Sequence, residues 1–203
     1  MHIRILQAVA VLLAALVVGL AVFWHPEPEP RPMPVARGPL GGDFTLASAD
    51  GPVSLSALRG KVVLVYFGYT YCPDICPTAL TAVAEGLKRL SAEESARVAV
   101  LFVSVDPERD TPAHLKEYAA FFHPAIVGVT GTPEEIAAIA RRYGVHYAKA
   151  KVDTAGGGYV MDHSSDTYLI GPDGALKGRI SHGAAAEQVA AEIRRHLQQN
   201  PNP

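Results

Sequence analysis

Cysteine is scarce in this sequence, with two residues in a chain of 203. Neither lies near the apolar N-terminal run, which excludes a lipoprotein anchor built on a lipidated cysteine. No third cysteine is present, which disfavours a closed structural zinc site, because such a site takes four protein ligands. Long basic runs are also absent and the formal net charge is −2, so we expect no nucleic-acid partner.

One long apolar run is present at residues 5–24, with Gln7 as its single polar side chain and no charge. Twenty helical residues span about 30 Å, the thickness of a bilayer's hydrocarbon core. A cleaved signal peptide is the alternative, but the run exceeds a signal core of about 7–15 residues and ends in Phe23 and Trp24, which resemble interfacial anchors. We therefore expect an N-terminal transmembrane helix within a membrane anchor at residues 1–25.

The flanks of this run predict how the chain is oriented. Arg4 is the only charged side chain before Glu27, so the positive-inside rule leaves the N-terminus in the cytoplasm. Residues 26–41 are rich in proline and predict an extended linker. The remaining domain, residues 42–198, is then expected on the periplasmic or extracytoplasmic side of a bacterial inner membrane, behind a single membrane pass.

The soluble domain shows buried strands separated by amphipathic helices. Residues 62–67 and 98–103 are apolar at every position, which is typical of central strands in a parallel sheet. The pattern further predicts helices at residues 80–90, 115–122, 136–143 and 186–197, a short strand at 126–129 and an antiparallel hairpin at 168–181. This order indicates an α/β protein with a thioredoxin-like fold, in which helices flank a central mixed β-sheet.

Both cysteines lie in the sequence GYTYCPDICP at residues 68–77, directly after the first predicted strand. Pro77 fits the first turn of the next helix and puts Cys76 at or next to its N-cap, where the helix dipole lowers a thiol's pKa. A structural disulfide, a redox dithiol and a metal site are all open. The structural disulfide is weakened because a bridge between Cys72 and Cys76 would close too small a loop to restrain the unfolded chain much. The redox dithiol is weakened because thioredoxin-type dithiols ordinarily use Cys-x-x-Cys, whereas three residues separate these cysteines.

A histidine, His163, stands in residues 161–170, where thioredoxin-type proteins carry a cis-proline and this chain has no proline. Two thiolates and one imidazole suit copper, since thiolates hold Cu(I) and the nitrogen helps to retain Cu(II). Zinc is the competing metal. An incomplete shell of protein ligands suits a metal that is handed on.

Three motifs in order make the chain similar to the Sco/SenC family, copper-binding thioredoxin-fold proteins of cytochrome c oxidase assembly. They are CPDICP at 72–77 after a buried strand, SVDPERDTP at 104–112 after the next strand, and DHS at 162–164. The resemblance covers about residues 42–196 and so includes the whole predicted soluble domain.

The resemblance implies one copper ion per chain, Cu(I) or Cu(II), with Cys72, Cys76 and His163 as its ligands. It also implies that the two cysteines form a reversible, redox-active disulfide. Asp162 and Asp106 are candidates to orient these ligands by hydrogen bonding without touching the metal, as carboxylates often orient a metal-bound imidazole.

Other polar residues are expected to be structural. Asp110 precedes Thr111 and Pro112, an ordinary helix start, and is expected to cap that helix. The glycines at 156–158 predict a hairpin turn rather than a phosphate loop, because no Lys-Ser/Thr follows them. The remaining histidines lack metal spacing with the cysteines and are expected at the surface or at caps: His2, His25, His114, His123, His146, His182 and His196.

The resemblance implies a membrane-tethered copper metallochaperone, not an enzyme, that delivers copper to the dinuclear copper centre of cytochrome c oxidase. Its expected partners are the oxidase subunit with that centre and a periplasmic copper donor or thiol–disulfide reductase. The alternative function is a thiol–disulfide reductase that keeps the copper-ligand cysteines of the oxidase reduced. The two functions separate at His163, which a carrier requires and a reductase can spare. A thiol peroxidase is disfavoured, because Thr70 stands two residues before Cys72 rather than three.

Overall fold

The structure is a computed structural model that describes residues 2–23, 40–152 and 158–199. The chain divides into two compact units, residues 1–34 and 35–203.

The described residues of the first unit form one helix, α1 (His2–Phe23). In the described part of the chain, no helix meets the length and apolarity that a membrane crossing requires. The predicted transmembrane helix is therefore not confirmed. The predicted linker at 26–41 lies outside the described residues except for its last two positions.

The second unit is built on a five-stranded mixed sheet with the order β5-β4-β3-β8-β9. Its strands are β3 (Val62–Gly68), β4 (Val98–Ser104), β5 (Ile126–Val129), β8 (Thr167–Ile170) and β9 (Leu176–Ile180). The central strand, β3, pairs in parallel with β4 and antiparallel with β8. It is buried at every position, as its unbroken run of apolar residues predicts. The mixed sheet expected from the sequence is confirmed.

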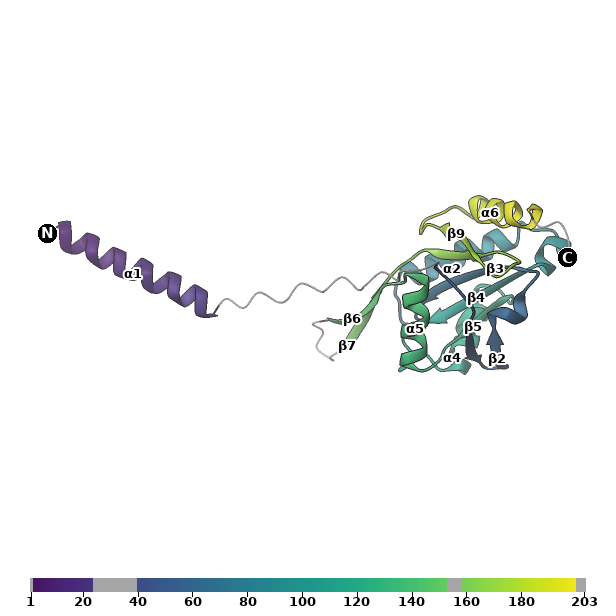
Figure 1. The fold of residues 1–203 in the computed structure, drawn as a ribbon, viewed down its shortest axis with the longest axis horizontal. Coiled ribbons are helices and arrows are strands. Elements are labelled where there is room, and N and C mark those ends of the chain that lie inside the picture. Colours follow the sequence, from purple (N-terminus) through teal and green to yellow (C-terminus); the bar gives the residue numbers. More distant parts are fainter. Residues whose placement is uncertain (1, 24–39, 153–157, 200–203) are drawn as a thin grey trace. The chain divides into compact units, whose positions relative to one another are not determined.

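Five helices flank this sheet: α2 (Ile75–Leu87), α3 (Ala92–Ala96), α4 (Pro112–Phe122), α5 (Pro133–Tyr143) and α6 (Ala186–Gln198). The helix after β3, α2, buries a stripe that includes Leu80, Val83 and Leu87. It packs against α6, and the two approach closely because Gly86 has no side chain: a Cβ there would stand 2.7 Å from Val189 Cγ1. Helices around a mixed sheet give the unit its thioredoxin-like α/β fold (Figure 1).

Two hairpins lie outside the main sheet. One joins β1 (Thr45–Ser48) to β2 (Gly51–Ser54) and leads into a short 3₁₀ helix, η1 (Leu55–Leu58). The other joins β6 (Tyr147–Val152) to β7 (Gly158–His163), and it reaches away from the sheet in Figure 1. The strand predicted to end at His163 is thus present, whereas most of its predicted glycine turn lies outside the described residues.

The carboxyl ends of β3 and β4 lie side by side, with Gly68 opposite Ser104. The two motifs that follow these strands, residues 72–77 and 104–112, therefore meet at one edge of the sheet. Polar groups and ligand sites of open α/β sheets gather at such an edge.

Candidate metal centre

The two cysteines lie at the start of α2, and both are free thiols. Cys72 belongs to the cysteine loop, residues 69–74, and is 8% exposed, while Cys76 is fully buried. The helix begins at Ile75, with Asp74 at its N-cap position, so Cys76 lies one residue further into the helix than the sequence predicted. The backbone N–H of Cys76 donates to Cys72 Sγ at 3.4 Å, which places both sulfur atoms at the helix N-terminus.

This geometry makes the two thiols unequal in acidity. A hydrogen bond from the Cys76 thiol lowers the pKa of Cys72 to about 4 despite burial, and backbone N–H groups of Asp74 and Cys76 add to the effect. The same hydrogen bond, together with burial, raises the pKa of Cys76. Cys72 is therefore a thiolate at neutral pH, whereas Cys76 keeps its proton until a cation favours its loss.

His163 completes the group from the end of β7. Its Nε2 atom lies 3.3 Å from Cys76 Sγ, and its Nδ1 atom lies 2.8 Å from the backbone carbonyl oxygen of Ser164. A carbonyl accepts hydrogen bonds only, so Nδ1 carries a proton, and Nε2 is the ring atom that faces the sulfur. The ring packs edge-on against Tyr66 and Tyr69, with ring centres 6.3 and 5.8 Å away.

The structure thus brings together the three residues that the sequence singles out as ligands. One ligand atom from each of Cys72, Cys76 and His163 lies within 4.8 Å of the other two. Two soft sulfurs and one imidazole nitrogen fit copper in both of its common oxidation states. A metal ion held here would touch the cysteine loop, α2 and the β6–β7 hairpin at once.

The two carboxylates predicted to support these ligands differ in position. Asp162 is exposed on β7 beside His163, and neighbouring residues of a strand point to opposite faces. In the described part of the chain, the Nδ1 contact goes to Ser164 instead. An orienting role for Asp162 therefore stays a prediction without a contact to support it. Asp106 is buried, and its Oδ1 atom accepts a hydrogen bond from the Tyr159 hydroxyl at 2.8 Å, which ties it to the strand that carries His163.

The expectation that Asp110 caps a helix is wrong. The N-cap of α4 is Thr111, whose hydroxyl accepts from the backbone N–H of His114 at 3.2 Å. Asp110 is fully buried and accepts hydrogen bonds from the hydroxyls of Thr70 and Ser104, each at 2.6 Å, and from the Thr70 backbone N–H at 3.1 Å. It therefore anchors the cysteine loop, since Thr70 stands two residues before Cys72.

His114 is a second residue whose role the sequence concealed. Its Nε2 atom lies 3.0 Å from the Thr70 hydroxyl, and its ring centre lies 6.0 Å from that of Tyr71. It is thus a neighbour of the cysteine loop rather than a plain surface histidine. The one available signal was its place in the helix that follows the second motif.

A thioredoxin-like domain with two thiols and an imidazole within reach of one ion defines a metal-binding member of that fold. The family model described as SCO1/SenC matches residues 33–198. The chain belongs to the SCO1/SenC family.

Known relatives agree with this assignment. The bovine protein SCO2 homolog, mitochondrial, is 42% identical over 158 residues, which are 77% of this chain and 59% of that protein. The chain thus spans about three fifths of that relative's length. The structure of Bradyrhizobium japonicum ScoI with copper bound has a TM-score of 0.71 and 38% identity, covering 78% of this chain and 99% of that one. BsSco, a member of the Sco family of cytochrome c oxidase assembly proteins in which a disulfide switch was identified, has a TM-score of 0.62 and 29% identity, covering 81% of this chain and 96% of that one.

Proposed function

We propose that this protein is a copper metallochaperone that delivers copper to the dinuclear copper centre of cytochrome c oxidase during assembly. The observation that carries the proposal is the group of Cys72, Cys76 and His163, whose ligand atoms lie within 4.8 Å of one another. The similar ScoI structure with copper bound supports the choice of metal. Three protein ligands leave a coordination position at which an acceptor's ligand can enter, as delivery requires.

The chain's own residues divide the work of binding. Cys72 offers a thiolate at neutral pH because its pKa lies at about 4. Cys76 loses its proton when the cation binds, since a bound metal lowers the pKa of a ligating thiol. His163 offers Nε2 while its Nδ1–H stays hydrogen-bonded to a carbonyl, which keeps the ring oriented.

A thiol–disulfide reductase is the second candidate, and the unequal acidity of the two thiols favours it. The Cys72 thiolate would attack a disulfide of the oxidase subunit, displacing one of its thiolates and leaving a mixed disulfide. Cys76, as a thiolate after losing its proton, would then attack Cys72, so that the second partner thiolate leaves. Two electrons pass to the partner, and the Cys72–Cys76 disulfide is the oxidised product.

The variant His163→Ala separates these functions. Two thiolates can still hold Cu(I) nearly linearly, whereas Cu(II) loses its nitrogen anchor. Loss of a group that hydrogen-bonds to a metal ligand lowers metal affinity by about 10- to 100-fold. Because His163 is itself a proposed ligand, we expect the Cu(II) affinity of the variant to fall by more than this. Cu(I) affinity should change less. At limiting copper the variant should fail to support oxidase assembly in cells, with partial rescue by added copper.

The matched control is His146→Ala, an exposed histidine next to the same hairpin, which should behave as the parent. If His163→Ala supports assembly as well as the parent at low copper while Cys72→Ser does not, the reductase function replaces the carrier function.

We also propose that the chain is tethered to a bacterial inner membrane, with its domain on the periplasmic or extracytoplasmic side. The support is the apolar run at residues 5–24 with Arg4 before it. The chain should then stay with the membranes during carbonate extraction. Recovery of a soluble form that begins within or after the run would show that the segment is a cleaved signal.

A further inference from the structure

Arg109 lies between the cysteine loop and the hairpin that carries His163. Its guanidinium carbon is 3.8 Å from the ring centre of Tyr159 on β7. The same carbon is 4.8 Å from the ring centre of Tyr71 and 5.7 Å from that of Tyr69, both in the cysteine loop. A guanidinium within about 6 Å of an aromatic ring centre is attracted by the ring's quadrupole. One side chain therefore contacts two of the three segments that carry the candidate ligands.

Hydrogen bonds fix the position of this guanidinium. Its Nε atom donates to Asp106 Oδ2 at 2.5 Å, and its Nη1 atom donates to the backbone carbonyl of Tyr159 at 3.1 Å. The Tyr159 hydroxyl donates to the other carboxylate oxygen of Asp106 at 2.8 Å. The Asp106 side chain is fully buried and that of Arg109 is 25% exposed, so the carboxylate of this charge-assisted pair is shielded from water. We call Asp106, Arg109 and Tyr159 the Arg109 clamp.

The β6–β7 hairpin depends on such directional contacts. It is a separate two-stranded sheet, and an isolated hairpin is marginally stable in water. The buried side chain of Met161 adds apolar burial, which has no directional preference. An ion pair between Lys149 and Glu108 also joins the hairpin to the turn before Arg109, but both side chains are about half exposed, and such pairs stabilise little.

We propose that Arg109 is a positioning residue that holds His163 at a fixed place relative to the two sulfur atoms. By doing so it sets the affinity of the site for Cu(II) relative to its affinity for Cu(I). The proposal rests on the copper-binding function proposed above. Cu(I) is satisfied by two thiolates, whereas Cu(II) needs the imidazole in place. Lysine cannot substitute for Arg109, because an ammonium lacks the planar fork that stacks on a ring and reaches two acceptors.

Hydrogen exchange of the full chain, reduced and without copper, tests the positioning directly. The variant Arg109→Lys keeps the charge beside Asp106 but loses the stacked fork, and Tyr159→Leu removes the ring on which the fork stacks. In both variants the backbone amide hydrogens of β6 and β7 should exchange at least about tenfold faster than in the parent. This corresponds to about 1.4 kcal/mol of lost protection. Amides of β3 and β4 should keep the parent's rates.

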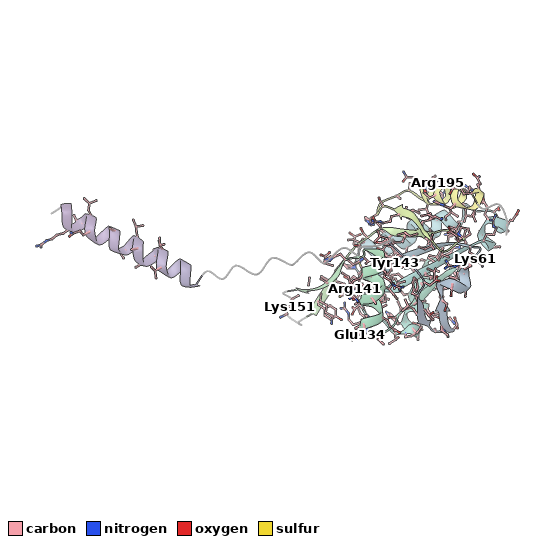
Figure 2. All side chains as sticks on the ribbon, in the orientation of Figure 1. Lys61, Glu134, Arg141, Tyr143, Lys151 and Arg195 are labelled. Carbon is pink, nitrogen blue, oxygen red and sulfur yellow. The ribbon has the colours of Figure 1, made fainter. Side chains whose placement is uncertain are left out.

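The matched control is Arg195→Lys, an arginine paired with Glu192 on α6. Figure 2 shows Arg195 on α6, apart from Lys151 on the hairpin. This control should exchange as the parent does throughout. Unchanged hairpin exchange in both clamp variants would overturn the proposal. A uniform rise that includes β3 and β4 in both variants would also overturn it, because Arg109 would then support the fold as a whole.

Copper titration of the same variants supplies the second readout. In both clamp variants the affinity for Cu(II) should fall by about 10- to 100-fold, which is the usual effect of losing a residue that positions a metal ligand. The affinity for Cu(I) should change much less. Equal losses for the two ions would contradict the selective role of Arg109. If the parent itself binds no copper, the proposed function fails, and the exchange experiment still decides whether Arg109 positions the hairpin.

Discussion

Cys72 and Cys76 differ in acidity because Cys72 lies just before α2, whereas Cys76 lies within the first turn of that helix. The helix N-terminus and the Cys76 thiol both donate toward the Cys72 sulfur, which is also the more accessible of the two. The site therefore holds one thiolate and one thiol at rest. Such a pair is prepared for a cation or for attack on a disulfide without the repulsion that two adjacent thiolates would create.

Alkylation of the reduced, copper-free protein with iodoacetamide checks this asymmetry. Because the pKa of Cys72 lies at about 4, its thiolate fraction is nearly complete above about pH 5.5. Its rate constant should be nearly flat from about pH 5.5 to 7.5 and should fall only as the pH approaches 4. An ordinary thiol would gain about tenfold per pH unit over that range.

Peptide mapping should find Cys72 modified first, and the flat profile should disappear in Cys72→Ser. Preferential modification of Cys76, or a tenfold climb per pH unit in the parent, would contradict the assignment of the thiolate to Cys72.

At the scale of elements, two adjacent residues in the turn between β4 and α4 have different structural roles. Thr111 caps α4, while Asp110 turns inward, anchors the cysteine loop through Thr70 and accepts a hydrogen bond from Ser104 at the end of β4. The position of the cysteine loop is thus set by a carboxylate from the turn between β4 and α4. This arrangement links the second motif to the cysteine loop through two part-buried hydrogen bonds.

Substitution of the two neighbours by alanine separates these roles. Thr111→Ala should lower the free energy of unfolding by about 1 kcal/mol, the usual cost of a lost helix cap. Asp110→Ala removes the acceptor of the buried Ser104 hydroxyl and of the partly buried Thr70 hydroxyl and backbone N–H, and should cost about 2–4 kcal/mol. It should also change the alkylation rate of Cys72, which Thr111→Ala should leave as it is. Equal unfolding costs in urea titrations would show that Asp110 does not anchor the loop.

Much of this architecture was predictable, because the central strands are apolar at every position and the main helices carry clear stripes. The β1–β2 hairpin and α3 were not anticipated. Their strands have four residues and the helix has five, which is too short for a period to show. These elements lie away from the candidate site, so their omission left the site prediction unaffected.

The candidate site was predictable in part. The three candidate ligand residues were selected from their chemistry and motifs, and the fold explains why they meet. The role of Asp110 could not be foreseen, because an aspartate before Thr111 and Pro112 has the pattern of a cap. Its actual partner, Thr70, stands 40 residues earlier in the chain, a separation that no local pattern reports.

At the scale of the whole molecule, the thioredoxin-like unit holds three ligand-bearing segments at one edge of its sheet. The cysteine loop and α2 are fixed by the central strand, while His163 comes from a hairpin outside the main sheet. With copper bound as proposed, disulfide formation would require the same two sulfur atoms.

The most direct test of the account is the copper content of the purified full chain in its reduced and oxidised forms. The reduced chain should bind one copper ion, with sulfur-to-copper charge-transfer absorption after addition of Cu(II). The chain with a Cys72–Cys76 disulfide should take up none until it is reduced, since a sulfur in a bridge cannot serve as a thiolate ligand. Tight, stoichiometric copper binding by the disulfide form, or none by the reduced form, would contradict the account.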